Sequence, residues 1–210
     1  MTPDDLVAAV DVSRETLARL TAYVTLLEKW QNTVNLVGRG TLSDVWRRHI
    51  LDSAQLYSLL PASLGHVVDL GSGAGFPGLV LAIMGAEDVE LIEANTRKCA
   101  FLREVARVTN TRVTITNDRI EGKDPRIADV VTARALAPLP RLLDYAKAYV
   151  GPETICLFLK GQRLHEELTE AQKTWKMGVT TIPSLSDAGG SVLCLRKLSR
   201  TNDTNKPSST

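Results

Sequence analysis

Residues 69–78 read DLGSGAGFPG, with three glycines at alternate positions followed by Phe-Pro-Gly. The preceding residues 66–70 form a short apolar run typical of a buried strand, and a helical apolar pattern follows at 77–84. Glycine lets a backbone turn sharply and approach a ligand closely, where a Cβ atom would collide. A glycine-rich turn that serves only tight packing is the alternative, but the flanking strand and helix favour a ligand. The stretch therefore predicts a cofactor at the end of a strand of an α/β sheet.

An acid follows the glycine stretch at a spacing that indicates a nucleoside. Glu93 ends a second apolar run and lies 22 residues after Gly71. In nucleoside-binding α/β folds, an acid at about this distance accepts hydrogen bonds from the ribose hydroxyls. Acids at strand ends are also commonly solvated, so the interpretation of Glu93 depends on the glycine stretch.

Two classes of cofactor use a loop of this kind. A dinucleotide fingerprint requires glycine or alanine at its sixth position, and counting from Gly71 that position holds the bulky Phe76. The order acid-any-Gly-any-Gly-any-Gly instead resembles motif I of class I methyltransferases, which bind S-adenosylmethionine. That resemblance places Gly71, Gly73 and Gly75 against the cofactor and Asp69 near the amino group of its methionine tail. A nicotinamide-dependent oxidoreductase stays as the alternative from another class.

Strand and helix patterns alternate after residue 65. The expected strands are 66–70, 89–92, 113–115, 129–131 and 154–159, and the expected helices are 77–84, 95–108, 139–149 and 164–175. Such alternation predicts an α/β fold with a doubly wound, mostly parallel sheet covered on both faces, the Rossmann-like architecture of class I S-adenosylmethionine methyltransferases. Two further apolar runs, near 179–182 and 192–195, predict a terminal antiparallel hairpin.

The first part of the chain predicts a helical extension. Ser13 can cap a helix in which apolar residues recur at three- and four-residue steps. A second helix is expected to open at Ser43-Asp44 and to continue to about residue 60. The predicted organisation is an N-terminal helical extension at 1–65, a class I methyltransferase domain at 66–198 and a polar, disordered tail at 199–210.

Composition is that of an ordinary globular protein. With 210 residues, of which 44% are hydrophobic and 23% charged, the chain can bury one substantial core. The formal net charge is +1, so any surface for nucleic acid must be local. The acidic start and the lack of an apolar run of about 18 residues predict neither a leader nor a membrane helix, and we expect a cytoplasmic enzyme. The cysteines and histidines show no ligand pattern, which predicts reduced core thiols and no metal.

Several short segments occur in a fixed order along the chain. They are Asn35-Leu36 after a helix carrying Trp30, Arg48 to Ser53 (RHILDS), Asp69 to Gly78, Glu93 with Arg97-Lys98 and Phe101-Leu102, Arg119-Ile120-Glu121, Arg134-Ala135, and Lys160-Gly161. This ordered set resembles the RsmG or GidB family of small-subunit ribosomal RNA guanine-N7 methyltransferases over about residues 15–197. The resemblance implies methyl transfer from S-adenosylmethionine to N7 of a guanine in 16S ribosomal RNA.

The same resemblance implies a set of cofactor contacts. They are Gly71, Phe76, Ile120, Glu121 and Arg134, with Glu93 on the ribose. Ile120 and Glu121 follow the third expected strand, where an apolar flank and an acid acceptor suit adenine. Glu121 is also explained as an acid at a helix start, which the helix dipole favours. Two positions depart from the family pattern: Val37 stands where a Thr or Ser is expected and removes a hydroxyl contact, and Ile120 replaces a common Ala, which changes packing only.

Methylation of guanine N7 requires few catalytic groups from the protein. N7 carries an unprotonated lone pair, so no general base is required, and orientation can carry most of the work. The sequence lacks a Pro-Pro dipeptide of the kind that grips an exocyclic amine, and no cysteine follows a proline as a carbon-5 nucleophile would. A cation can hold guanine O6 while N7 faces the methyl group. Arg134 and Lys160, at the carboxyl ends of expected strands, are the candidates, although Lys160 is also explained as a solvated strand-end charge.

A local basic patch is expected to bind the RNA. Its candidates are Arg39, Arg47, Arg48, His49, Lys160 and Arg163. Arg47 and Arg48 are equally well explained as a solvated face, and His49 can instead pair with Asp52 three residues later. The expected partner is 16S ribosomal RNA in the small ribosomal subunit, and the enzyme is expected to be a monomer. Two alternatives stay open. One is a small-molecule methyltransferase in which the helical extension is a lid, and the other is a non-catalytic RNA-binding module.

Overall fold

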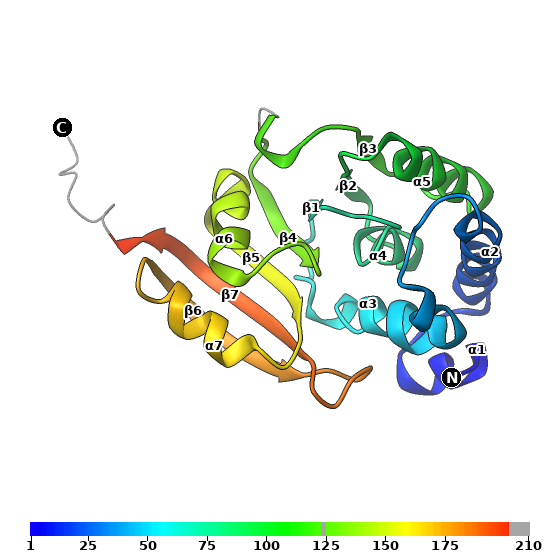
Figure 1. The fold of residues 1–210 in the computed structure, drawn as a ribbon, viewed down its shortest axis with the longest axis horizontal. Coiled ribbons are helices and arrows are strands. Elements are labelled where there is room, and N and C mark those ends of the chain that lie inside the picture. The colour runs from blue at the N-terminus through cyan, green and yellow to red at the C-terminus, as the bar shows by residue number, and fades with distance from the viewer. Residues whose placement is uncertain (123–124, 202–210) are drawn as a thin grey trace.

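A seven-stranded sheet organises the chain (Figure 1) in the computed structural model, which describes residues 1–122 and 125–201. The strands are β1 (His66–Leu70), β2 (Asp88–Ile92), β3 (Thr114–Thr116), β4 (Ala128–Arg134), β5 (Val150–Lys160), β6 (Trp175–Pro183) and β7 (Ser191–Arg200). Their order across the sheet is β3-β2-β1-β4-β5-β7-β6. Strands β1 to β5 are parallel, and β7 runs antiparallel to both β5 and β6. The predicted doubly wound sheet with a terminal antiparallel hairpin is confirmed.

Helices precede the sheet and alternate with its strands. The α-helices of the described residues are α1 (Pro3–Ala9), α2 (Arg14–Gln31), α3 (Asp52–Ala54), α4 (Gly78–Met84), α5 (Thr96–Val108), α6 (Leu139–Ala146) and α7 (Leu164–Ala171). Short 3-10 turns occupy Arg39–Asp44, Tyr57–Leu59, Ile120–Gly122 and Lys147–Tyr149, and a π-helical turn occupies Trp46–Leu51. Helices α4 to α7 each begin within one residue of the expected start. Helix α7 ends earlier than expected because β6 already begins at Trp175.

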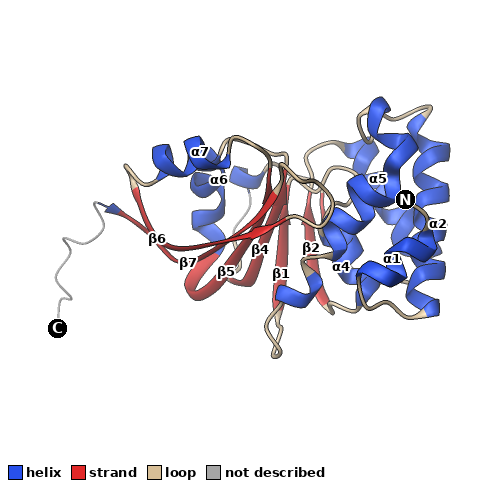
Figure 2. Ribbon diagram, turned by 90° about the horizontal axis from the view of Figure 1, so that it is seen from below, coloured by secondary structure: helices blue, strands red, loops and turns tan. Residues whose placement is uncertain are grey.

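Alternate residues along the central strands face two separate hydrophobic clusters. Val130 and Leu157 belong to one cluster, whereas their neighbours Val131 and Phe158 belong to the other. Because side chains of a strand alternate between faces, these apolar runs bury both faces of the sheet. Helices α4 and α5 with the N-terminal helices cover one face, and α6 and α7 cover the other, as Figure 2 shows.

The N-terminal helices share their core with the sheet. Helix α2 begins as predicted, because the Ser13 side chain accepts a hydrogen bond from the backbone N–H of Thr16 at 3.1 Å. Its fully buried Leu20 and Leu27 lie in the same cluster as Val130 of β4. The helical character of this region is therefore established, and the domain boundary at residue 65 stays a prediction.

Two features of the first 60 residues differ from the expectation. Helix α1 was not predicted, although Thr2 and Asp5 form a reciprocal capping box around its first turn. The single helix expected from Ser43 to about residue 60 is instead two 3-10 turns, a π turn and the short α3. Helix propensity is a weak prior, and here the side chains of His49 and Asp52 make tertiary contacts that favour the wider π turn.

The end of the methyltransferase domain lies slightly beyond its predicted position. Ser199 and Arg200 belong to β7 and pair with Lys176 and Trp175 of β6, so the predicted tail starts two residues too early. The rest of that predicted tail, from residue 202, lies outside the described residues. Within the described part of the chain, no helix combines the length and apolar character needed to cross a bilayer.

Candidate active site

A cavity of about 800 Å³ opens at the carboxyl ends of β1, β4 and β5, where ligands bind in parallel α/β sheets. Besides residues 134–138 after β4 and residues 159–161 after β5, three parts of the chain form most of its walls. They are the glycine loop (residues 71–77), the N-terminal segment (residues 36–55) and the β6–β7 loop (residues 184–190). The predicted site residues that line the cavity are Gly71, Gly73, Phe76, Arg134, Lys160, Arg48 and His49. The structure thus brings together about half of the predicted set.

The glycines of the loop have different roles. Gly71, Gly73 and Gly75 all have positive φ values, of 66°, 59° and 101°. A Cβ atom on Gly73 would face open space, with the nearest atom 3.9 Å away. A Cβ atom on Gly75 would lie 2.8 Å from the Tyr23 hydroxyl and 2.9 Å from Cβ of Leu79. Gly73 therefore leaves room on the cavity side, whereas the Cβ position of Gly75 is occupied by Tyr23 and Leu79. A backbone contact of Gly75 with the cofactor stays a prediction.

Asp69 lies beneath the glycine loop, fully buried. Its Oδ1 accepts a hydrogen bond from the Thr132 hydroxyl at 2.8 Å, and its Oδ2 accepts one from the backbone N–H of Gly78 at 3.2 Å. Burial raises the pKa of Asp69 to about 6. The carboxyl group fixes the start of α4 against β1 and β4 and does not line the cavity. Its predicted position near the amino group of the cofactor stays a prediction.

Glu93 connects the end of β2 to the glycine loop. Its Oε2 accepts a hydrogen bond from the backbone N–H of Gly73 at 2.8 Å, and its Oε1 accepts one from the N–H of Asn95 at 2.7 Å. Each carboxylate oxygen has a second lone-pair direction, so both can still accept from a ligand hydroxyl. The predicted juxtaposition of Glu93 with the glycine loop is therefore present, and its contact with ribose stays a prediction.

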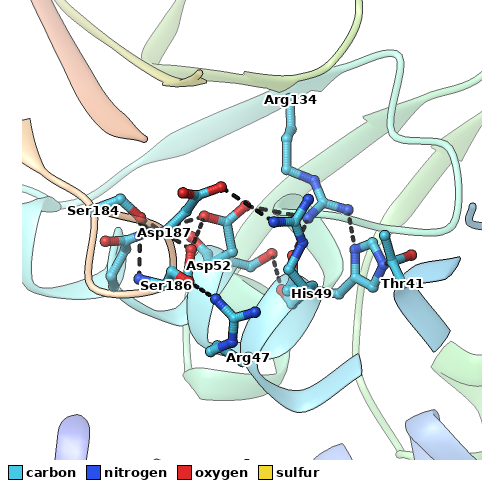
Figure 3. A network of polar contacts seen from close by, with 11 residues as sticks. Thr41, Arg47, His49, Asp52, Arg134, Ser184, Ser186 and Asp187 are labelled. Atoms are coloured by element: carbon cyan, nitrogen blue, oxygen red, sulfur yellow. Dashed lines mark hydrogen bonds and ion pairs between the residues drawn. The ribbon is translucent and has the colours of Figure 1, made fainter. Parts of the chain in front are cut away.

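Arg134, at the end of β4, organises the cavity wall on the N-terminal side (Figure 3). Its guanidinium donates to the Arg48 carbonyl at 2.9 Å, to Oδ2 of Asp52 at 3.2 Å and to Nδ1 of His49 at 2.7 Å. It also lies 4.9 Å from the centre of the Phe76 ring, a cation–π distance. His49 and Asp52 thus bind one guanidinium between them instead of pairing with each other.

The hydrogen bonds of His49 fix its protonation. A guanidinium only donates, so Nδ1 of His49 accepts, and Nε2–H donates to the Thr41 hydroxyl at 2.8 Å. That hydroxyl in turn donates to the Gly38 carbonyl at 2.7 Å. Burial, followed by the nearby charges of Arg134 and Arg48, lowers the pKa of His49 to about 3. His49 is therefore a neutral structural residue that supports the cavity wall at Gly38.

The chain is similar to known proteins over most of its length. The family model described as GidB, rRNA small subunit methyltransferase G, matches residues 16–192. The chain belongs to the GidB family. A protein of Paramagnetospirillum magneticum named Ribosomal RNA small subunit methyltransferase G is 57% identical over 200 residues, 95% of this chain and 98% of that protein. A protein of the same name from Rhodospirillum rubrum is 53% identical over 200 residues, 95% of this chain and 100% of that protein.

Solved structures of other methyltransferases share the fold of this GidB-family chain. A TehB-like SAM-dependent methyltransferase from Corynebacterium glutamicum has a TM-score of 0.57 at 12% identity and covers 84% of this chain and 98% of its own. A ribosomal protein L11 methylase from Lactobacillus delbrueckii subsp. bulgaricus has a TM-score of 0.56 at 16% identity, with 70% and 78% covered. At these identities the likeness concerns the fold alone. With the family membership, it confirms a class I, S-adenosylmethionine-dependent methyltransferase.

The cavity of this GidB-family enzyme suits S-adenosylmethionine. Open space beside Gly73 leaves a cradle that any side chain would fill, and Glu93 offers carboxylate oxygens next to it. Leu36, Phe76 and Leu136 add apolar surface to the same cavity. A nucleoside needs these two kinds of wall, because its base is largely apolar and its sugar carries hydroxyl groups. In residues 1–122 and 125–201, His, Cys, Asp and Glu form no group of three or more that could hold a metal ion.

Lys160, at the end of β5, lines the cavity as predicted, with an ion pair that the sequence did not reveal. Its ammonium lies 2.5 Å from Oε2 of Glu167 and donates to the Ala137 carbonyl at 3.1 Å. The same Glu167 oxygen accepts from the backbone N–H of Leu139 at 2.8 Å. Two of the three ammonium donors are engaged, which holds the charge in place and leaves one donor for a ligand.

Two residues of the predicted basic patch, Arg47 and Arg48, make ion pairs and hydrogen bonds within the protein. Arg47 pairs with Asp44 at 2.5 Å and donates to the Ser186 carbonyl, also at 2.5 Å. Arg48 pairs with Asp187 at 3.2 Å. The contacts with Ser186 and Asp187 join the N-terminal segment to the β6–β7 loop, and Figure 3 shows Arg47 directed toward Ser186. Arg47 and Arg48 therefore have a structural role, and their contact with RNA stays a prediction.

Two predicted cofactor residues and one predicted RNA residue lie away from the cavity wall. Ile120 packs against the hydrophobic cluster on the α6 side and its carbonyl accepts from the Tyr149 hydroxyl at 3.1 Å. Glu121 is exposed in the adjacent 3-10 turn. Arg163 is 80% exposed and pairs with Glu166 at 3.3 Å. Contacts of these residues with cofactor or RNA stay predictions.

The sequence did not indicate the β6–β7 loop as part of the site. Asp52 accepts from the Ser186 hydroxyl at 2.6 Å, and Gln55 accepts from the backbone N–H of Leu185 at 2.8 Å. Serine, glycine and aspartate between two strands predict a loop, and nothing in that pattern identifies a partner more than 120 residues away. Lys98 also lines the cavity. Its position at the start of α5, close after Glu93, could have indicated this from the sequence.

Proposed function

We propose that the chain transfers a methyl group from S-adenosylmethionine to N7 of a guanine in 16S ribosomal RNA. The observation that carries the proposal is the position of Lys160 in this GidB-family chain: its anchored ammonium lines the same cavity as the glycine loop. Guanine presents O6 and N7 side by side as acceptors. A lysine that donates to O6 therefore orients N7 toward the cofactor side of the cavity.

The walls of the cavity and the loop after β3 supply the cofactor contacts in this proposal. Gly71, Gly73 and Phe76 cradle the cofactor, and Glu93 accepts from the ribose hydroxyls. Ile120 and Glu121 contact the adenine from the loop after β3. Bound S-adenosylmethionine supplies an electrophilic methyl group on a sulfonium.

The remaining residues orient the base and exclude water. Three of the five N–H groups of Arg134 hold the N-terminal segment, so its main contribution is the shape of the wall, and the other two stay available to the base or the cofactor. No residue has to remove a proton, because N7 is unprotonated. Orientation in a closed cavity is worth about 7–11 kcal/mol in favourable cases.

The RNA backbone approaches over basic residues at the rim. Arg39 adjoins the cavity-lining Gly38, and among the described residues it makes no ion pair or side-chain hydrogen bond. Arg163 follows Lys160 and Gly161 on the opposite rim. Free or solvated cations of this kind contact phosphates without sequence preference. The enzyme acts in the cytoplasm as a monomer, and it needs no metal because an unprotonated nucleophile and a sulfonium require no Lewis acid.

Methylation of defined ribosomal particles tests the proposal. Purified protein is incubated with methyl-labelled S-adenosylmethionine and small ribosomal subunits from cells that lack this gene, and the RNA is digested to nucleosides. We expect label in N7-methylguanine from 16S RNA and none in subunits from cells that carry the gene. Label in another nucleoside, or no label in RNA, contradicts the proposed substrate. Methylation of a small molecule instead favours a small-molecule methyltransferase in which the N-terminal extension is a lid.

A further inference from the structure

Helix α2 packs directly behind the glycine loop through one side chain. Tyr23, fully buried in α2, donates a hydrogen bond from its hydroxyl to the backbone carbonyl of Ala74. Ala74 is itself a buried member of the loop and lines the cavity. The two residues are 51 positions apart in the chain, so the contact is purely tertiary.

The Tyr23 ring and hydroxyl occupy space that the loop leaves for them. The ring stacks on Phe76, with ring centres 5.3 Å apart and planes 19° apart, and Phe76 also stacks on His49 at 5.0 Å. The hydroxyl lies only 2.8 Å from the position that a Cβ atom on Gly75 would take, so it would collide with any side chain there. Helix α2 and three consecutive loop residues, 74–76, therefore fit together as one unit.

The hydrogen bond holds the part of the loop that faces the ligand. Within the loop, the backbone N–H groups of Gly75 and Phe76 both donate to the Ser72 carbonyl, at 2.7 and 3.1 Å. That turn leaves the Ala74 carbonyl directed away from it, to be satisfied by Tyr23. Burial raises the pKa of Tyr23 well above its usual range, so the hydroxyl keeps its proton and stays a donor. A buried carbonyl that loses its donor is unfavourable, so the loop would shift to find another.

We propose that Tyr23 is a positioning residue for the methyl donor: through Ala74 and Phe76 it holds the glycine loop in the shape that binds S-adenosylmethionine. The N-terminal helices then belong to the cofactor site and serve it before any RNA arrives. This inference rests on the proposed placement of the cofactor at the glycine loop, and it is independent of which nucleotide is methylated.

The test compares two variants that each remove one buried hydroxyl. Tyr23→Phe removes the donor to Ala74 and keeps the ring. Thr109→Val is the matched control, because the buried Thr109 hydroxyl donates to the Val105 carbonyl at 2.8 Å at the far end of α5. For each protein, the dissociation constant for S-adenosylhomocysteine is measured by calorimetry without RNA, together with the melting temperature and the hydrogen exchange of residues 72–76.

We expect Tyr23→Phe to raise the dissociation constant and the KM for S-adenosylmethionine about tenfold, with kcat at saturating cofactor close to wild type. Exchange at residues 72–76 rises in the same variant. Thr109→Val lowers the melting temperature similarly and leaves the dissociation constant unchanged. If Tyr23→Phe lowers the melting temperature but binds S-adenosylhomocysteine like wild type, the positioning role is refuted. Because no RNA is present, this result stands apart from the success or failure of the ribosomal substrate.

Discussion

Nδ1 of His49 accepts a hydrogen bond from Arg134 at 2.7 Å, which joins the N-terminal segment to the end of β4 at the cavity wall. The ring of His49 also stacks on Phe76 of the glycine loop. A protonated imidazole has no free lone pair at Nδ1 and would face the guanidinium with a like charge. The contact therefore requires neutral histidine, and it makes the stability of this wall depend on pH.

A His49→Gln variant should reveal that dependence. The pKa of His49 is about 3 in the folded protein against an ordinary value of 6.5. Between these values the unfolded chain binds a proton that the folded protein does not, so the stabilisation is complete above pH 6.5 and is lost as pH falls. We expect the advantage of wild type over His49→Gln in unfolding free energy to shrink below pH 6.5, by up to ~1.4 kcal/mol per pH unit.

Urea denaturation of both proteins from pH 8 to pH 4.5 measures this difference. Asp69, whose pKa is raised to about 6, acts in the opposite direction, since its folded form binds a proton more readily than the unfolded form. It is present in both proteins, so its contribution cancels in the comparison. A gap that stays constant over this range would show that His49 is not held neutral.

Gly73→Val should abolish cofactor binding and leave the fold in place. The new side chain would enter the open space on the cavity side, where the nearest existing atom to its Cβ is 3.9 Å away. At a φ of 59° any side chain also strains the backbone, and Gly73→Ala carries that strain with less volume. We expect S-adenosylhomocysteine binding to be undetectable for valine and weakened for alanine in calorimetry, with circular dichroism like wild type. Undiminished affinity of the valine variant contradicts the loop assignment.

Lys160→Met should separate binding of the methyl donor from transfer to RNA. The substitution keeps the apolar stem and removes the ammonium that we propose to hold guanine O6. One such base contact is worth about 1–3 kcal/mol, so we expect kcat on small subunits to fall roughly 10- to 100-fold. Affinity for S-adenosylhomocysteine should stay within about twofold of wild type.

Glu167→Gln is the control for Lys160→Met. It keeps the ammonium and removes only the charge of its partner, so a smaller loss of kcat is expected. Equal activity of Lys160→Met and wild type on small subunits would remove Lys160 from the reaction.

Arg39→Glu should weaken binding of the RNA and spare the cofactor site. Arg39 is exposed beside Gly38 on the cavity rim, and losing one phosphate contact should raise the Kd for small subunits several-fold to about tenfold and reduce the salt slope by about one. Lys176→Glu makes the same change in net charge on the edge strand β6 and should leave the Kd unchanged. Identical binding of the two variants would indicate that the RNA does not cross this rim.

The local sequence patterns were sufficient for the sheet and for half of the cavity. Apolar residues on both faces of 66–70 and 154–159 predicted buried parallel strands, and the glycines after β1 predicted the loop that the structure places at the cavity. The spacing from Gly71 to Glu93 predicted a real contact, since Glu93 accepts from Gly73. These signals are local, because each depends on a strand and the turn that follows it.

Contacts between distant segments could not be predicted in this way. Arg48 and His49 were candidates for an RNA patch, yet Arg48 and Asp52 bind residues of the β6–β7 loop, and His49 binds Arg134. A charge pattern gives the sign of a surface and not the partner opposite it. The same limit applies to Gly75, whose packing against Tyr23 needs the position of α2.

Asp52 and Ser186 meet at the cavity although 134 positions separate them. During translation, the first of these residues leaves the exit tunnel long before the second has been added. Until Ser186 has been added, the cavity lacks the wall that the β6–β7 loop forms, and a guanine base would be exposed on that side. The enzyme gains its full shape only in the last stage of its own synthesis, because β7, which lies between β5 and β6 in the sheet, follows Ser186 in the chain.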